Sequence, residues 1–246
     1  MRYGVRGGKK IVISYYSLDK LITLKILAFD TSSSYCSIAL WIDGEILSRS
    51  ILAEQRHSEI LLPVLQELLA ESELTLVQLD GIAFGAGPGS FTGLRIACGV
   101  AQGLAFGSGL PVIGISTLEA LAQQAGVNNV ITAIDARMGE IYHAAYIKSA
   151  DNWENVSAPI LCLPRYAPLM KGDNWVGCGS GFDKYCDELK SHYGSSISHL
   201  DPGFFPHARE MAQLAAQGFK QGLGVDPVEI APIYLRNKIA LKENER

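Results

Sequence analysis

Two stretches decide the fold: GAGPGSFTGLRIACGVAQGLAFG (residues 85–107) and LAFDTSSSYCSIALW (residues 27–41). The first is a glycine-rich turn that leads into a helix with one charged residue. The second is a buried strand that ends at Asp30 and is followed by four hydroxyl side chains. Glycine lets a backbone approach a ligand closely, and the N-terminus of a helix attracts anions. Together the stretches are typical of a phosphate-binding α/β protein and raise the question of whether that use is retained.

The chain repeats its opening motif. The segment VITAIDARMGEIYHAAY (residues 130–146) matches KILAFDTSSSYCSIALW (residues 25–41), so that Asp135 aligns with Asp30 and the apolar positions agree on both sides. Each copy reads as a strand, an acidic residue, a tight turn and a second strand. Self-similarity of this kind indicates an internal duplication, and we expect two similar lobes that face each other.

The expected division of the chain follows from this repeat. A first lobe covers residues 25–116, a second lobe covers residues 117–225, and residues 226–246 return to the first lobe. Residues 1–24, which begin as a basic and glycine-rich run, are expected to be a poorly ordered extension outside the fold.

The composition limits the function. The chain has 246 residues, of which 48% are hydrophobic and 19% are charged, and its net charge is −4. A basic surface that holds nucleic acid unaided is therefore not expected, and no apolar run reaches the ~20 residues that span a membrane. The five cysteines include no Cys-x-x-Cys pair, which favours free thiols in a reducing compartment, the cytoplasm.

The two strand-end acids and the glycine turn form a candidate nucleotide site. Asp carboxylates bind Mg²⁺ through water, while hydroxyl and backbone N–H groups hold phosphate. The residues assigned to this site are Asp30, Thr31, Asp135, Gly87 and Gly89.

Several features indicate that this site is vestigial. Thr31 and Ala136 follow the two acids, where an active phosphotransfer site has glycine, and their Cβ atoms crowd the phosphate. The glycine turn lacks the lysine of a P-loop and the spacing of a dinucleotide-binding fingerprint. We therefore expect no catalytic residue, no metal and no cofactor. Two alternatives stay open: a turn whose glycines serve packing alone, and a nucleotide-dependent phosphotransferase that uses Asp30 and Asp135.

Two expected helices present a surface that is unusual for solvent contact. In the helix over residues 58–71, leucines cover a wider arc than a helix resting on one sheet requires. In the helix over residues 92–108, Gly99, Gly103 and Gly107 recur every four residues, although each costs about 1 kcal/mol relative to alanine. We expect a partner protein to cover this surface; the alternative is that the second lobe covers it. The residues assigned to the partner interface are Leu61, Leu65, Leu68, Arg95, Ile96, Gly99, Gln102, Gly103 and Phe106.

Six stretches carry a family resemblance: ILAFDTSSSYCSIAL (26–40), RHSEILLPVLQELL (56–69), AFGAGPGSFTGLRIACGVAQGLAFG (83–107), PVIGISTLEALAQ (111–123), AIDARMGEIYHAAY (133–146) and PIYLRN (232–237). In this order they resemble the bacterial TsaB (YeaZ) family, and the resemblance covers residues 25–238. It implies an α/β fold of the two-lobed actin-like ATPase (ribonuclease H-like) class, with a duplicated mixed sheet flanked by helices.

The resemblance also implies a function. TsaB proteins act as a non-catalytic subunit in making threonylcarbamoyladenosine at position 37 of tRNAs that read codons beginning with A. They pair with a catalytic paralogue, TsaD, and the small ATPase TsaE joins them, so that tRNA is reached only through the complex. TsaB proteins alone tend to form homodimers. Pairing with TsaD uses the first two helices of the N-terminal lobe, which are here residues 58–71 and 92–108.

One departure from the paralogue bears on catalysis. TsaD carries two metal-binding histidines on the segment after the strand that corresponds to residues 111–115. Thr117 and Leu121 stand at those positions here. Leucine has no atom that coordinates a metal, and threonine is a poor ligand. The resemblance therefore implies that this chain lacks the metal that would polarise the transferred carbonyl group.

Overall fold

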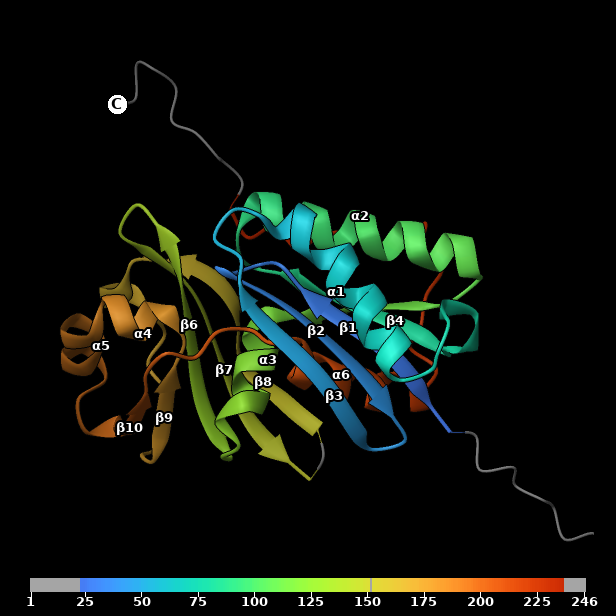
Figure 1. The fold of residues 1–246 in the computed structure, drawn as a ribbon. Helices are drawn as coiled ribbons and strands as arrows, with labels where there is room; N and C mark the ends of the chain where they lie inside the picture. The colour runs from blue at the N-terminus through green and yellow to red at the C-terminus, as the bar shows by residue number, and fades with distance from the viewer. Residues whose placement is uncertain (1–22, 151, 237–246) are drawn as a thin grey trace, which may run out of the picture.

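The computed structural model describes residues 23–150 and 152–236 and shows two lobes, each built on one mixed β-sheet (Figure 1). The extension expected over residues 1–24 lies outside the described residues, apart from Thr23 and Leu24. Leu24 packs against a core cluster of the first lobe, so the described fold begins before Lys25.

The first sheet consists of β1 (Lys25–Asp30), β2 (Tyr35–Ile42), β3 (Glu45–Leu52), β4 (Gly81–Gly87) and β5 (Val112–Ser116). Its order is β3-β2-β1-β4-β5. The first three strands are antiparallel neighbours, whereas β1, β4 and β5 run parallel. Asp43 and Gly44 join β2 to β3 with positive φ angles of 48° and 102°, which is the turn that an Asp-Gly pair predicts.

The second sheet consists of β6 (Asn129–Arg137), β7 (Glu140–Ser149), β8 (Asn152–Cys162), β9 (Trp175–Cys178) and β10 (Ile197–Asp201). Read from β8, its order is β8-β7-β6-β9-β10, with the same parallel and antiparallel pairings as the first sheet. Asp135 lies near the end of β6 as Asp30 ends β1. The duplication and the fold class expected from the sequence are confirmed.

The helices are α1 (His57–Glu71), α2 (Phe91–Ser108), α3 (Thr117–Ala125), α4 (Ser180–Lys184), α5 (Cys186–Tyr193) and α6 (Ala208–Lys220), with short 3₁₀ turns η1 (Leu76–Gln78), η2 (Pro164–Tyr166) and η3 (Gly194–Ser196). Helices α1 and α2 cover one face of the first sheet and α6 covers the other (Figure 1). Helix α3 contacts both β6 and α6. No helix in the described part of the chain is long and apolar enough to cross a membrane.

Helix α6 belongs to the first lobe, although it follows the second sheet in the sequence. Leu27 and Phe29 of β1 pack with α1 and α2, whereas Ile26 and Ala28, which point to the opposite face, pack with α6. The division expected at residue 225 is therefore wrong for α6. Its apolar stripe shows which side is buried but not which of two similar sheets it covers.

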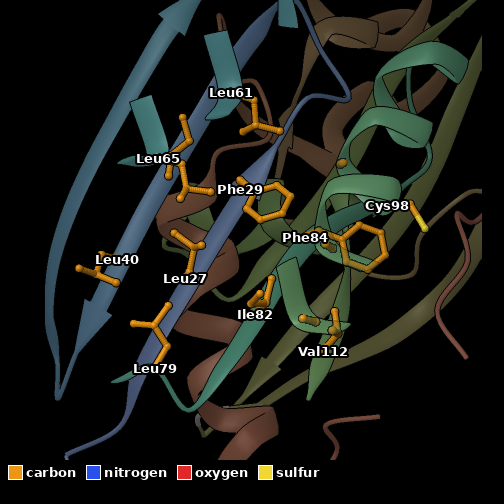
Figure 2. Packing of buried hydrophobic residues seen from close by; sticks show 14 of the residues in the cluster. Leu27, Phe29, Leu40, Leu61, Leu65, Leu79, Ile82, Phe84, Cys98 and Val112 are labelled. Atoms are coloured by element: carbon orange, nitrogen blue, oxygen red, sulfur yellow. The ribbon is translucent and has the colours of Figure 1, made fainter. Parts of the chain in front are cut away.

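The leucines of α1 form part of the core of the first lobe (Figure 2). Leu61, Leu65 and Leu68 are at most 2% exposed, so their assignment to the partner interface is wrong. Their arc is wide because α1 is covered both by the sheet and by the connection to β4, whose Leu74 and Leu79 belong to the same cluster.

Strand β4 ends later than the sequence indicates. Gly85 and Gly87 are strand residues, and the turn itself consists of residues 88–90. The Ser90 hydroxyl accepts a hydrogen bond from the Gly93 amide at 3.4 Å and caps α2. The glycine-rich stretch is therefore mostly strand and helix, with little free loop.

The cysteines are free thiols, as the sequence predicts. Cys36, Cys98 and Cys178 are buried, and Cys162 and Cys186 are partly buried. They pack as small apolar side chains.

Most of the C-terminal segment, residues 225–236, lies on the first lobe, and its last residues, Leu235 and Arg236, contact the second. Val225 forms a bridge with Val112 of β5, and the Ile233 amide donates to the Ala86 carbonyl of β4 at 2.7 Å. Residues 237–246, which the sequence also assigns to this return, lie outside the described residues.

Candidate functional site

A cleft of about 820 Å³ lies between the two lobes. It is lined by the turn after β1, the N-terminus of α2, the turn between β6 and β7, and the C-terminal segment. Of the five residues assigned to the nucleotide site, Gly89 and Asp135 line this cleft. Asp30, Thr31 and Gly87 are not among the lining residues.

Asp30 is fully buried and is not among the residues that line the cleft. Its Oδ2 accepts hydrogen bonds from the Ser32 amide at 3.0 Å and the Ser32 hydroxyl at 2.9 Å. Its Oδ1 is buried without a hydrogen-bond partner among the described residues. Burial raises the pKa of the Asp30 carboxyl to about 7, although both bonds from Ser32 oppose the shift. The assignment of Asp30 to metal or nucleotide binding is therefore wrong.

Thr31 is also used inside the lobe. Its hydroxyl donates to the Gly93 carbonyl at 2.7 Å, and the side chain is fully buried. A Cβ atom at Gly93 would overlap the Thr31 carbonyl, and a Cβ atom at Gly85 would overlap the Asp30 carboxyl. These glycines are required because the turn after β1 packs directly on β4 and α2. The assignment of Thr31 to ligand binding is wrong for the same reason.

Gly87 is covered by the chain itself. It has a φ of +118°, and an added Cβ would lie 2.7 Å from the Ile233 carbonyl oxygen of the C-terminal segment. A Cβ atom added at Gly89 would likewise lie 2.8 Å from the Cβ atom of Ser32. Gly87 is therefore not available to a ligand, and the packing alternative left open by the sequence accounts for it; Gly89 is constrained by packing but also lines the cleft.

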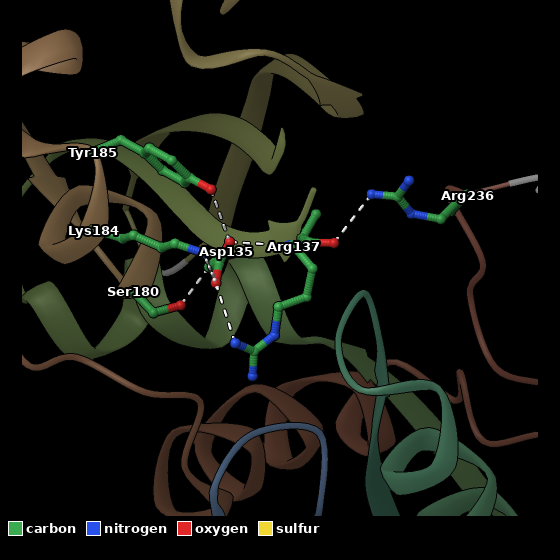
Figure 3. Close-up of polar contacts among 7 residues, drawn as sticks. Asp135, Arg137, Ser180, Lys184, Tyr185 and Arg236 are labelled. Atoms are coloured by element: carbon green, nitrogen blue, oxygen red, sulfur yellow. Dashed lines mark hydrogen bonds and ion pairs between the residues drawn. The ribbon is translucent and has the colours of Figure 1, made fainter. Parts of the chain in front are cut away.

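Asp135 is held in a polar cluster at the turn between β6 and β7 (Figure 3). Its carboxylate accepts from Lys184 at 2.9 Å, from Tyr185 at 3.2 Å and from the Arg137 amide at 3.0 Å. Partial burial alone would raise its pKa, but the bonds from Lys184, Arg137 and Tyr185 outweigh burial and lower it. The Asp135 amide donates to Ser180 at 3.1 Å. Asp135 thus acts as an anchor for this turn.

The two acids that the duplication makes equivalent are in opposite states. Asp30 is buried, with its pKa raised to about 7, and Asp135 is a paired carboxylate. Asp135 lines the cleft and Asp30 does not, so they offer no pair of oxygen ligands for Mg²⁺ there. Arg137, whose side chain is 85% exposed, presents a guanidinium to the cleft, and such a group binds anions.

Sequence reasoning missed Lys184, Tyr185 and Arg236. The first two hold Asp135, and Arg236 ties the C-terminal segment to the same turn. Lys184 and Tyr185 could have been found from the duplication, because the second sheet repeats the first and so places β9, and the segment after it, beside β6. Arg236 lies in an extended stretch without periodicity, so the sequence carries no comparable signal for it.

The positions aligned with metal-binding histidines are used for packing. The Thr117 hydroxyl donates to the Pro88 carbonyl at 2.5 Å. Leu121 is fully buried in a cluster with strands of the second lobe. Neither side chain presents a free ligand atom to a metal.

Helix α2 carries an open surface, which we call the α2 glycine face: Gly99, Gly103 and Gly107. All three are exposed, and a Cβ atom added at any of them meets nothing within 4 Å. Beside this face Phe106 is 76% exposed and Ile96 is partly buried. The second lobe does not cover these residues, so that alternative is wrong.

Two residues assigned to the partner interface bind the C-terminal segment. Arg95 Nε donates to the Tyr234 hydroxyl at 3.1 Å, and Gln102 Nε2 donates to the Ile230 carbonyl at 3.3 Å. Their direct role is therefore to hold this segment against α2. The sequence did not show this because an extended segment has no helical period to match with α2.

Comparisons with known proteins agree with this architecture. The family described as TsaD, tRNA N6-adenosine threonylcarbamoyltransferase, matches residues 48–168. The chain is 39% identical over 234 residues to "tRNA threonylcarbamoyladenosine biosynthesis protein TsaB" of Haemophilus influenzae, covering 89% of this chain and 97% of that protein. The Escherichia coli protein of the same name is 38% identical, with 89% and 98% covered. The solved structure of YeaZ from Pseudomonas aeruginosa has a TM-score of 0.79 at 37% identity, covering 86% of this chain and 100% of that one. The chain therefore belongs to the TsaB (YeaZ) family.

Proposed function

We propose that this chain is an accessory subunit in the biosynthesis of threonylcarbamoyladenosine in tRNA. It pairs through α1 and α2 with a catalytic subunit of the TsaD type, and a TsaE-type ATPase joins the complex. The printed names of its relatives support the pathway. The TsaD family match covers the segment that contains α1 and α2, which supports a partner with a similar helix pair.

The observation that carries the proposal is the open α2 glycine face. Three helical glycines cost about 1 kcal/mol each relative to alanine, and nothing in the described chain lies against them. Such a face lets the backbone of another helix come close. A protein partner of similar construction fits this surface better than solvent does.

The state of the cleft supports an accessory role in place of catalysis. Asp30 is buried, Asp135 is engaged by Lys184, and Thr117 and Leu121 offer no metal ligand. In this proposal tRNA contacts the chain only within the complex, and the chemistry belongs to the partner.

The proposal is tested by replacing Gly103 with leucine. The added side chain enters open space in the isolated chain, so the melting temperature should not fall, and it should rise slightly because leucine favours a helix over glycine. Titration calorimetry with a TsaD-type subunit should show a Kd raised at least about tenfold, or ~1.4 kcal/mol. Ser191→Leu, at an exposed position of α5, serves as the matched control and should bind as the wild type. Unchanged binding by Gly103→Leu rejects the pairing surface.

The phosphotransferase left open by the sequence is disfavoured by the buried Asp30 and the paired Asp135, although the cleft of about 820 Å³ is large enough for a small ligand. It requires Mg²⁺-nucleotide to bind near Asp30 and Asp135. Calorimetry of the isolated chain with ATP and Mg²⁺ separates the two functions. We expect a Kd weaker than ~1 mM, and micromolar binding would favour the phosphotransferase.

A further inference from the structure

The two lobes are joined at one place by α3 and α6. Helix α3 packs on β6 of the second lobe and also contacts α6 of the first lobe. Gln123 Nε2 of α3 donates to Gln213 Oε1 of α6 at 2.8 Å, and Gln217 of α6 donates to Asn152 of β8 at 2.5 Å. Neither helix contributes a residue to the lining of the cleft in the described chain. This joint therefore lies away from the cleft.

A second joint is formed by residues 233–236, which we call the strap. All four strap residues line the cleft. On the first lobe, the Ile233 amide donates to the Ala86 carbonyl of β4 at 2.7 Å. Arg95 Nε of α2 donates to the Tyr234 hydroxyl at 3.1 Å. These bonds seat the first half of the strap between the end of β4 and α2.

The second half of the strap is tied to the second lobe. Arg236 donates to the Ala136 carbonyl at 3.0 Å and pairs with Glu140 at 2.6 Å (Figure 3). The Arg236 and Glu140 side chains are only 18% and 28% exposed, so salt screens this pair less than a surface pair. Leu235 packs against the core cluster that contains α3 and β6 residues. The strap thus connects the two lobes across the cleft.

The two ends of the strap are held in different ways. The first-lobe end includes a backbone hydrogen bond to β4, whereas the contacts of the second-lobe end are made by the side chains of Leu235 and Arg236. Both of these side chains lie outside the central core of the second lobe, since they are partly buried. Regions held by few buried contacts open at a lower free energy than the core does. The second-lobe end can therefore detach while both sheets stay folded.

We propose that the strap sets the separation of the two lobes. While Leu235 and Arg236 are engaged, the lobes keep the separation of this structure. When both side chains are released, the lobes move apart about the contact between α3 and α6, as domains move about a hinge. This inference concerns the chain alone and does not depend on the proposed partner.

The test is the double variant Leu235→Ser/Arg236→Ala, measured by double electron–electron resonance. Spin labels carried by noncanonical amino acids replace Glu67 of α1 and Ser191 of α5, which are exposed and lie on different lobes. Labels of this kind leave the five cysteines unmodified. The unmodified strap should give one narrow distance distribution, and the double variant should give a broader distribution with a longer median distance.

The matched control is Arg49→Ala. Arg49 pairs with Glu71 at 2.6 Å, the same separation as in the strap pair, but both residues belong to the first lobe. This variant should leave the distance distribution unchanged. A second label pair, in place of Glu45 and Glu67, lies within the first lobe and should report the same distance in every variant.

The outcomes decide the inference. A double variant that melts as a folded chain and keeps the original distance distribution overturns it, and so does an equal change in Arg49→Ala. If the double variant does not fold, Arg236→Ala alone decides, because it keeps the Leu235 contact. The median distance should then lengthen in the same direction by a smaller amount, and an unchanged distribution rejects the strap.

Discussion

Asp30 occupies a position suited to metal binding, but its neighbours have buried it. The Ser32 amide and hydroxyl hold one carboxylate oxygen, and Gly85 allows β4 to close over the other. The sequence located both strand-end acids through the duplication. It could not show their states, because burial of Asp30 and pairing of Asp135 depend on residues distant in the sequence, such as Gly85 and Lys184.

The buried carboxyl predicts a pH dependence of stability. The pKa of Asp30 is about 7 in the folded chain and 3.8 in a solvated carboxyl, so the folded state holds the proton more tightly. The protonated Asp30 carboxyl therefore contributes to the free energy of unfolding. This contribution is fully present below pH ~4 and is lost as pH rises through ~7, and the total loss is about 4 kcal/mol at most.

The variant Asp30→Asn keeps an oxygen for the two bonds from Ser32 and cannot ionise. Urea unfolding of both chains at pH 5 and pH 8.5 should show the stability difference moving in favour of the variant by about 2–3 kcal/mol as pH rises. Parallel pH profiles for the two chains would show that Asp30 does not titrate in this range.

At the scale of single elements, α1 shows the limit of a helical wheel. The wheel identified Leu61, Leu65 and Leu68 as apolar but not what covers them. Leu65→Ala should destabilise the isolated chain by about 2–5 kcal/mol, because it removes buried apolar atoms and leaves a cavity in the core. Leu62→Ala, on the same helix at 43% exposure, should cost less than about 1 kcal/mol. Equal losses in denaturant unfolding would contradict the assignment of Leu65 to the core.

Helix α2 contains glycines of two kinds that the sequence does not distinguish. Gly93 faces the Thr31 carbonyl, whereas Gly103 faces open space. Gly103→Ala should stabilise the isolated chain by roughly 0.5–1 kcal/mol through helix propensity. Gly93→Ala should lower the melting temperature because its Cβ forces the turn after β1 away. Calorimetric melting of the two variants measures the contrast, and a lower melting temperature for Gly103→Ala would show that its face is not open.

At the scale of the whole molecule, the repeat of Asp30 and Asp135 was enough to predict two lobes with the same sheet. The placement of α6 and of the C-terminal segment was harder to predict. Helix α6 returns to the first sheet after the chain has built the second, and the segment then crosses α2 and reaches the second lobe through Arg236. Both depend on long-range packing, for which local periodicity carries no information.

The central claim is that this chain acts by pairing and performs no chemistry of its own. The most direct measurement is threonylcarbamoyladenosine formation on tRNA in a reconstituted reaction with a TsaD-type subunit, a TsaE-type ATPase and the threonylcarbamoyl-adenylate donor. We expect no product from this chain alone, product from the complete mixture, and a loss with Gly103→Leu that is restored by raising the concentration of the variant chain. Modification of tRNA by the chain alone, or full activity of the mixture without it, would contradict the claim.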